Sequence, residues 1–235
     1  MSTVEGGGNV ITDGLVLYLD GANTKSYVSG STTWNDISRG GNTMALVNGP
    51  TFSSLNNGSI VFDGIDDRVS RTSSINTGQN FTVSAWIYPT LLGGTRRSIV
   101  GNGYNYSARN GWLFSTAGGG TNNSLFLSIG ADFVGIQAPA NILNTNEWAY
   151  VTATCQNGGV LSLYKNGQVI NGSTYGTAGT IIYTYPQFNV GFRDVGGIAP
   201  DPYTGRIAQT SVYNRVLSAT EVLQNYNATK SRFGL

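Results

Sequence analysis

The stretch that decides the fold is residues 81–89, Phe81-Thr-Val-Ser-Ala-Trp-Ile-Tyr-Pro89. The odd positions from Phe81 to Ile87 are all apolar, whereas the even positions change from small polar residues to the aromatic residues Trp86 and Tyr88. An alternation with a period of two predicts a β-strand that buries one face in a hydrophobic core. Pro89 ends this strand, because proline has no N–H to donate to a sheet.

Similar short apolar runs, separated by turn residues, extend in both directions from this strand. They predict strands over residues 15–19, 59–62, 98–101, 111–115, 124–130, 148–155, 181–185, 188–191 and 207–213. Asn166-Gly167 predicts a tight hairpin turn, because both residues tolerate the positive φ that a type I′ turn requires. Ser218 and Glu221 fit a capping box that opens one short helix ending near Lys230. The pattern indicates an all-β sandwich with a single C-terminal helix, covering residues 11–235 as one domain after a flexible, Gly-rich arm at residues 1–10.

The composition excludes several classes of function. Charged residues are only 11% of the 235 residues and the net charge is +1, which argues against a broad nucleic-acid or anionic-membrane surface. The chain has no histidine, so serine triads and His-ligated zinc are excluded. The single cysteine, Cys155, lies on the apolar face of its predicted strand and is interpreted as a small buried hydrophobe. Residues 1–9 have neither a basic patch nor an apolar run, so we expect no secretory signal peptide.

Several segments together resemble the laminin-G-like branch of the concanavalin A-like lectin/glucanase superfamily. In chain order they lie at residues 14–20, 33–38, 58–67, 81–89, 147–154, 165–167, 205–207 and 212–221. The resemblance implies a two-sheet antiparallel jelly roll whose loops gather along one rim. The C-terminal stretch 223–233 is similar to the ends of laminin-G-like proteins of tailed bacteriophages, which implies a virion protein made in the host cytoplasm.

Glucanases with this fold use paired carboxylates at two-residue spacing on one strand, because an acid and a nucleophile must flank one glycosidic bond. The chain has three glutamates, Glu5, Glu147 and Glu221, and no such acidic pair lies on a predicted strand. We therefore expect a protein that is not an enzyme and requires no cofactor.

The densest acidic cluster is Asp63, Asp66 and Asp67. Carboxylates and turn carbonyls could supply several of the oxygen ligands that calcium needs, although the spacing is not that of an EF-hand. The alternative, which we favour, is a turn whose Asp side chains bond to nearby N–H groups. The family's last strand often carries an Asp-Glu pair, and Ala208 and Gln209 stand in its place here. That departure weakens any inference of a metal site on this strand.

Two loop regions offer the chemistry of saccharide binding, which is aromatic faces for sugar C–H groups with amides and charged groups for hydroxyls. The candidates are Tyr104, Tyr106, Arg109 and Trp112 in the first region, and Arg193, Asp194, Asp201 and Tyr203 in the second. The alternative is that the aromatic rings only pack over sheet edges. Trp34, Trp86 and Trp148 lie within strand motifs and are expected in the core or on a sheet face. The basic spots Arg96-Arg97 and 230–232 are interpreted as solvated surface; the alternative is that they seat an edge of the domain against an acidic partner.

The resemblance and the missing acidic pair together favour a non-catalytic virion surface protein, either a capsid decoration or a tail-associated module. Weak carbohydrate binding at the rim would gain avidity if many copies are displayed. Its expected partners are other virion proteins and host-surface glycans. The alternatives are a purely structural virion protein that binds only other virion proteins, and, less favoured, a glycoside hydrolase.

Overall fold

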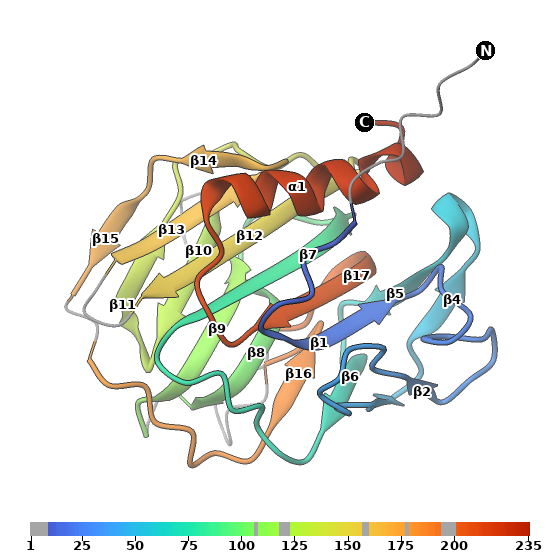
Figure 1. The fold of residues 1–235 in the computed structure, drawn as a ribbon, viewed down its shortest axis with the longest axis horizontal. Coiled ribbons are helices and arrows are strands. Elements are labelled where there is room, and N and C mark those ends of the chain that lie inside the picture. The colour runs from blue at the N-terminus through green and yellow to red at the C-terminus, as the bar shows by residue number, and fades with distance from the viewer. Residues whose placement is uncertain (1–8, 106–107, 118–122, 157–159, 177–178, 194–200) are drawn as a thin grey trace.

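In the computed structural model, residues 9–105, 108–117, 123–156, 160–176, 179–193 and 201–235 are described, with only the backbone for residues 131–133. The described chain folds into two antiparallel sheets and one α-helix, which confirms the predicted all-β sandwich with a C-terminal helix (Figure 1). Tyr106 and Asp194, both predicted to bind carbohydrate, lie outside these residues. In the described part of the chain, no helix has the length and apolar character needed to span a membrane.

The first sheet, sheet A, has eight strands among the described residues. Its order is β14 (Gln168–Ile170), β13 (Val160–Lys165), β12 (Ala149–Gln156), β7 (Phe81–Pro89), β17 (Thr204–Tyr213), β5 (Ser59–Asp63) and β4 (Thr51–Ser53), and β1 (Leu15–Asp20) pairs with the second half of β17. The strand predicted at residues 81–89 is therefore central, between β12 and β17. The predicted hairpin joins β13 to β14, with Asn166 at φ 52° and Gly167 at φ 77°.

The second sheet, sheet B, has nine strands among the described residues. Its order is β15 (Ser173–Tyr175), β11 (Ala131–Gln137), β10 (Leu125–Ile129), β9 (Asn110–Thr116), β8 (Arg97–Asn105), β16 (Phe188–Val190), β6 (Arg68–Arg71), β3 (Met44–Val47) and β2 (Thr33–Trp34). One predicted strand is wrong: residues 181–185 form no strand. Ile181 instead exchanges both backbone hydrogen bonds with the side-chain amide of Gln79, so its polar groups are satisfied without a neighbouring strand.

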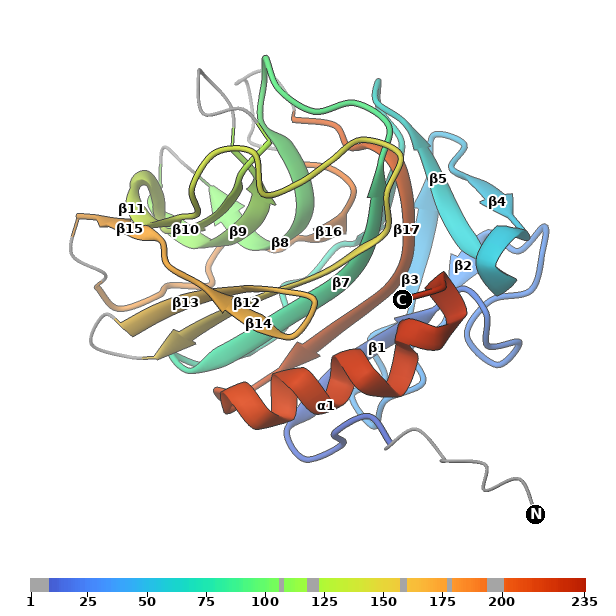
Figure 2. The ribbon, with the colours of Figure 1, turned by 90° about the horizontal axis from the view of Figure 1, so that it is seen from above.

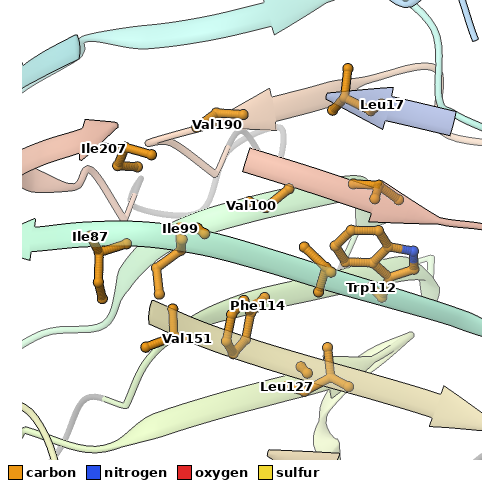
Figure 3. Close-up of a cluster of buried hydrophobic side chains, with 14 of the residues drawn as sticks. Leu17, Ile87, Ile99, Val100, Trp112, Phe114, Leu127, Val151, Val190 and Ile207 are labelled. Atoms are coloured by element: carbon orange, nitrogen blue, oxygen red, sulfur yellow. The ribbon is translucent and has the colours of Figure 1, made fainter. Parts of the chain in front are cut away.

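The main core lies between the sheets and contains the apolar face predicted for residues 81–87. Figure 3 shows side chains of both sheets meeting there, among them Leu17, Ile87, Val151 and Ile207 from sheet A and Val100, Phe114, Leu127 and Val190 from sheet B. Trp34 belongs to this core, and so does Cys155, whose burial raises the pKa of its thiol to about 12. Such a thiol is not a nucleophile at neutral pH, as expected from the sequence.

The outer face of sheet A is covered by helix α1 (Ala219–Thr229) and by the one-turn helix η2 (Lys230–Phe233), as Figure 2 shows for α1. Trp86 points to this side, where its ring stacks 4.0 Å from that of Phe233 and its Nε1 donates to Thr229 Oγ1 at 2.8 Å. Trp148 is half-buried beside Phe233. The aromatic even positions of residues 81–89 are thus explained, because this strand is buried on both faces.

The capping box predicted at Ser218 and Glu221 is present, and the Glu221 carboxylate also forms two bonds with Arg215, at 2.6 and 3.1 Å. The bonds from Arg215 hold the pKa of Glu221 at about 2, below its ordinary value of 4.5. Because the pKa of Glu221 is lower in the folded state than in the unfolded state, its ionised carboxylate stabilises the fold at pH values above 4.5. This contribution disappears as the pH falls from 4.5 to 2.

We therefore predict that Glu221→Gln lowers the free energy of unfolding by about 1 kcal/mol near neutral pH, because the cap and the charge pair are weakened. The difference between the variant and the wild type should shrink as the pH approaches the Glu221 pKa of about 2. Urea unfolding of both proteins across this range is the measurement. A difference that does not change with pH would contradict the assignment.

Candidate carbohydrate-binding rim

Five strands of the two sheets meet along one edge of the sandwich. At this edge β5 ends at Asp63, which pairs with Thr204 at the start of β17, and β16 ends beside the beginnings of β6 and β8. We call this edge the Asp63 rim. It comprises Asp63, Asp66, Asp67, Arg68, Arg97, Phe192, Arg193, Asp201 and Thr204.

The rim brings together two groups that the sequence predicted separately. The predicted acidic cluster lies on the turn after β5, and the predicted pair Arg193 and Asp201 lies on the segments that follow β16 and precede β17. Asp201 joins the rim through its carbonyl oxygen, which accepts a hydrogen bond from the Ser98 N–H at 3.0 Å. Arg193 Nε lies 2.7 Å from the Asp201 carboxylate, and both side chains are nearly buried. This ion pair orders the rim rather than offering two free charges.

Arg109 and Tyr104, which belong to the first predicted loop region, are not brought to this rim. Arg109 lies in the turn between β8 and β9, at the opposite end of β8, and is exposed with φ 53°. Tyr104, near the same end, is only 4% exposed and packs on Leu113. The two loop regions named from the sequence therefore do not form one site.

The structure corrects the interpretation of two aromatic candidates. Trp112 is fully buried, with its ring stacked 4.6 Å from Phe81. Tyr203 is also fully buried, packs edge-to-face on Phe62 at 6.1 Å, and its pKa is raised by burial. Neither ring can stack on a sugar, because neither has a face exposed to solvent. The alternative of aromatic packing, stated above, holds for these two residues.

Four rim residues were missed by the sequence reasoning: Arg68, Arg97, Phe192 and Thr204. Arg68 lies over the ring of Phe192 at 5.4 Å, and Arg97 donates to Thr204 Oγ1 at 3.1 Å and to the Pro202 carbonyl at 3.3 Å. Arg97 is 9% exposed, so the expectation of solvated surface is wrong at this position. The position of Arg97 directly before a predicted strand could have indicated that it lies at a sheet edge. Only the pairing of β8 with β16 shows which edge of the sandwich Arg97 reaches.

Three serines lie on the neighbouring strands β8, β9 and β10 of sheet B. Ser98 and Ser115 are directly opposite each other on β8 and β9, whereas Ser128 on β10 is opposite Leu113, two residues from Ser115. Their hydroxyl oxygens are buried, and none has a hydrogen-bond partner in the structure. Because these hydroxyls are buried, they offer no surface to a ligand.

The acidic cluster shows features of both interpretations that the sequence left open. Carboxylate oxygens of Asp63, Asp66 and Asp67 lie within 4.8 Å of one another, as a cation site requires. However, Asp67 Oδ2 already accepts from the Asp63 N–H at 2.9 Å, and Asp63 Oδ1 accepts from the Ile65 N–H at 2.8 Å. The Arg68 guanidinium also reaches the Asp66 carbonyl at 3.4 Å. Burial, together with repulsion from the other two carboxylates, raises the pKa of Asp67. The bonding fits a turn better than a calcium site.

We therefore predict that calcium leaves the thermal unfolding midpoint unchanged relative to EDTA, because ligand binding would raise it by mass action. Asp67→Ala should lower the free energy of unfolding by about 1–3 kcal/mol, because the partly buried hydrogen bond from the Asp63 N–H to the carboxylate is lost. Differential scanning calorimetry with and without calcium checks the first result, and urea unfolding checks the second. A calcium-dependent rise that Asp67→Ala abolishes would instead establish a cation site.

Comparisons with known proteins agree with this architecture. Residues 63–223 match the laminin G family described as the concanavalin A-like lectin/glucanases superfamily. A comparison with curated proteins finds no match.

Solved structures with the same fold come from proteins of several kinds. Domain 4 of AbnA, an arabinanase from Geobacillus stearothermophilus solved with arabinotriose, is 17% identical with a TM-score of 0.59, covering 92% of this chain and all of that one. The receptor-binding domain of botulinum neurotoxin type G is 18% identical with a TM-score of 0.64, and the match covers 91% of this chain and 51% of that one. Trypanosoma rangeli sialidase in complex with sialic acid is 16% identical with a TM-score of 0.65, over 95% of this chain and 34% of that one. The chain thus spans about half of the neurotoxin domain and a third of the sialidase.

The family match covers more than half of the chain, and the two antiparallel sheets with their C-terminal helix are the fold that the sequence predicted. The chain belongs to the concanavalin A-like lectin/glucanases superfamily.

Proposed function

We propose that this chain is a non-catalytic laminin-G-like domain that binds carbohydrate weakly through the Asp63 rim. The observation that carries the proposal is the convergence of five strands on one rim, where exposed carboxylates, a half-buried Arg68 and the Arg193–Asp201 pair lie together. Carboxylates and guanidinium groups are suited to sugar hydroxyls. The arabinotriose-bound domain of the arabinanase supports this proposal by analogy, because the match covers all of that domain and 92% of this chain.

The proposal that the domain is non-catalytic rests on how its carboxylates are used. Glu221 is engaged by Arg215, and Glu147 accepts from Asn144 Nδ2 at 2.8 Å. Glu5 lies outside the described residues. The closest carboxylates, Asp63, Asp66 and Asp67, share one turn instead of facing each other across a substrate cleft. Incubation with mixed polysaccharides should release no reducing ends; release that Asp66→Asn or Asp67→Asn abolishes would establish a glycoside hydrolase.

We further propose that the domain is displayed in many copies on a phage particle, as a decoration or tail-associated module. Multiple copies would convert weak rim contacts into avidity. The protein should be found in purified particles by mass spectrometry, and deletion of residues 2–10 should reduce its incorporation while the domain still folds. Absence from the particles would overturn the virion role.

A purely structural virion protein is the second candidate, because Trp112 and Tyr203 are buried and Arg193 and Asp201 neutralise each other. A glycan array probed with the multivalent protein separates the two. Binding to a defined set of glycans is expected for the carbohydrate-binding domain. A flat array, together with incorporation into particles, would favour the structural role.

A further inference from the structure

A cleft of about 650 Å³ lies on the side of the sandwich away from the Asp63 rim. β17 begins at the rim with Thr204 and ends at Tyr213, and the next residue, Asn214, lines the cleft. The other lining residues come from the segment entering β1 and from the loop after β2: Thr12, Asp13, Gly14, Leu15, Val16, Ile37, Ser38 and Arg39. A cleft of this volume suits a small organic ligand.

The loop after β2, which carries Ile37, Ser38 and Arg39, is held against β1 by the Asp36 carboxylate. Its oxygens accept from the backbone N–H groups of Tyr18 at 2.9 Å, Ser38 at 2.8 Å and Asn42 at 2.7 Å. The loop is also held because Asn42 Nδ2 donates to the Val16 carbonyl at 2.6 Å. A Cβ at Gly40 would lie only 2.0 Å from that same carbonyl oxygen, so the loop approaches β1 as closely as glycine permits. The cleft is therefore preorganised, which lowers the entropic cost of binding.

The charges in the cleft differ in how they are satisfied. Asp13 pairs with Arg215 at 2.8 Å, and Arg215 also holds Glu221. Arg39 is exposed, and no described residue bonds to its guanidinium or pairs with it. A guanidinium without an acidic partner, carried by a loop whose backbone is held in place, is suited to a planar carboxylate, which it can bind through two parallel hydrogen bonds.

The floor and the edges indicate what else the ligand carries. Leu15, Val16 and Ile37 are half-buried and make part of the lining apolar, while Thr12 and Asn214 supply a hydroxyl and an amide group; the Ser38 hydroxyl is already bonded to Asp36 and to the Gly40 N–H. We propose that this cleft is a second saccharide site, specific for a monosaccharide unit that bears a carboxylate, with that carboxylate on Arg39. The site does not depend on carbohydrate binding at the Asp63 rim, because it lies at the other end of β17.

The test compares galacturonic acid with galactose, which differ only in the C6 carboxylate. Backbone amide shifts of the ¹⁵N-labelled full chain are followed during titration into the millimolar range. Galacturonic acid should shift the amides of residues 12–16 and 37–39, and galactose should bind about tenfold more weakly or worse, because the charged hydrogen bonds are lost. Arg39→Gln should abolish this preference, whereas Lys25→Gln, which removes one positive charge at an exposed position outside the cleft, should keep it.

Three results would overturn the proposal: equal affinity for the two sugars, shifts that miss the cleft, or no shifts at all. Equal weakening by Lys25→Gln would also overturn it, because the effect would then be one of net charge. Shifts at residues 63–68 alone would leave the rim as the saccharide site and remove the cleft from consideration, so the two proposals fail separately.

Discussion

Trp112→Ala is expected to lower the free energy of unfolding by about 3–5 kcal/mol, as is typical for removing a buried tryptophan from a core. The ring has no exposed surface, stacks on Phe81 and meets Phe188 edge-to-face at 6.2 Å. Its Nε1 also donates to Thr77 Oγ1 at 3.3 Å, a partner that the alanine variant leaves buried. Because whole domains are stable by only about 5–15 kcal/mol, this loss should be evident in urea or thermal unfolding.

Arg109→Ala is the matched control, because Arg109 belongs to the same predicted loop region but is exposed. We expect it to change stability by less than about 0.5 kcal/mol. If Trp112→Ala does not fold, Trp112→Phe keeps the stacking contact and allows a smaller loss to be measured. A Trp112→Ala variant that unfolds like the wild type and loses only glycan binding would restore the original interpretation and contradict this core.

Arg232→Ala is expected to cost about 3–5 kcal/mol, because removal of one partner leaves a buried charge uncompensated. Arg232 Nη1 lies 2.6 Å from Asp20 Oδ1, and the two side chains are only 12% and 16% exposed. The guanidinium also donates to the carbonyls of Asn56, at 2.6 Å, and Gly58. This one side chain therefore ties the C-terminal turn to β1 and to the segment before β5.

Lys230→Ala is the control on the same turn, where Lys230 only approaches the ring of Tyr226 at 5.3 Å and should contribute about 1 kcal/mol or less. A double-mutant cycle with Asp20→Asn separates the pair from its surroundings. The double variant should be less destabilised than the sum of the two single variants. Equal effects of Arg232→Ala and Lys230→Ala would show that the pair does not stabilise the C-terminus.

The expectation that residues 230–232 form solvated surface was thus wrong for Arg232, and the reason is general. Short-range patterns show which residue types follow one another, but not which distant strand faces them. Asp20 is separated from Arg232 by 212 positions in the sequence. The capping box at Ser218 and the hairpin at Asn166 were predictable because their partners lie within a few residues.

The same distinction explains the candidate site. The cluster at Asp63 was found because its members are adjacent in sequence, and its use as a turn follows from local bonds. The burial of Trp112 was missed because the residues just before it are rich in glycine and polar side chains, which is typical of an exposed loop. The two rings that cover Trp112, Phe81 and Phe188, belong to segments distant in the sequence. The alternation at residues 81–89, by contrast, placed the central strand correctly, since a two-residue period is a property of the strand itself.

The central claim is that the Asp63 rim, and not the turn that carries Arg109 at the opposite end of β8, binds carbohydrate. The direct measurement is the affinity of multivalent protein for the glycan that it binds most strongly on the array. It is made on three proteins: the wild type, the rim variant Asp66→Asn with Arg68→Gln, and Arg109→Gln. All three changes are at accessible positions, so each variant should fold. We predict that the rim variant loses binding by at least about tenfold while Arg109→Gln binds like the wild type. Loss of binding in Arg109→Gln with an unaffected rim variant would contradict the claim.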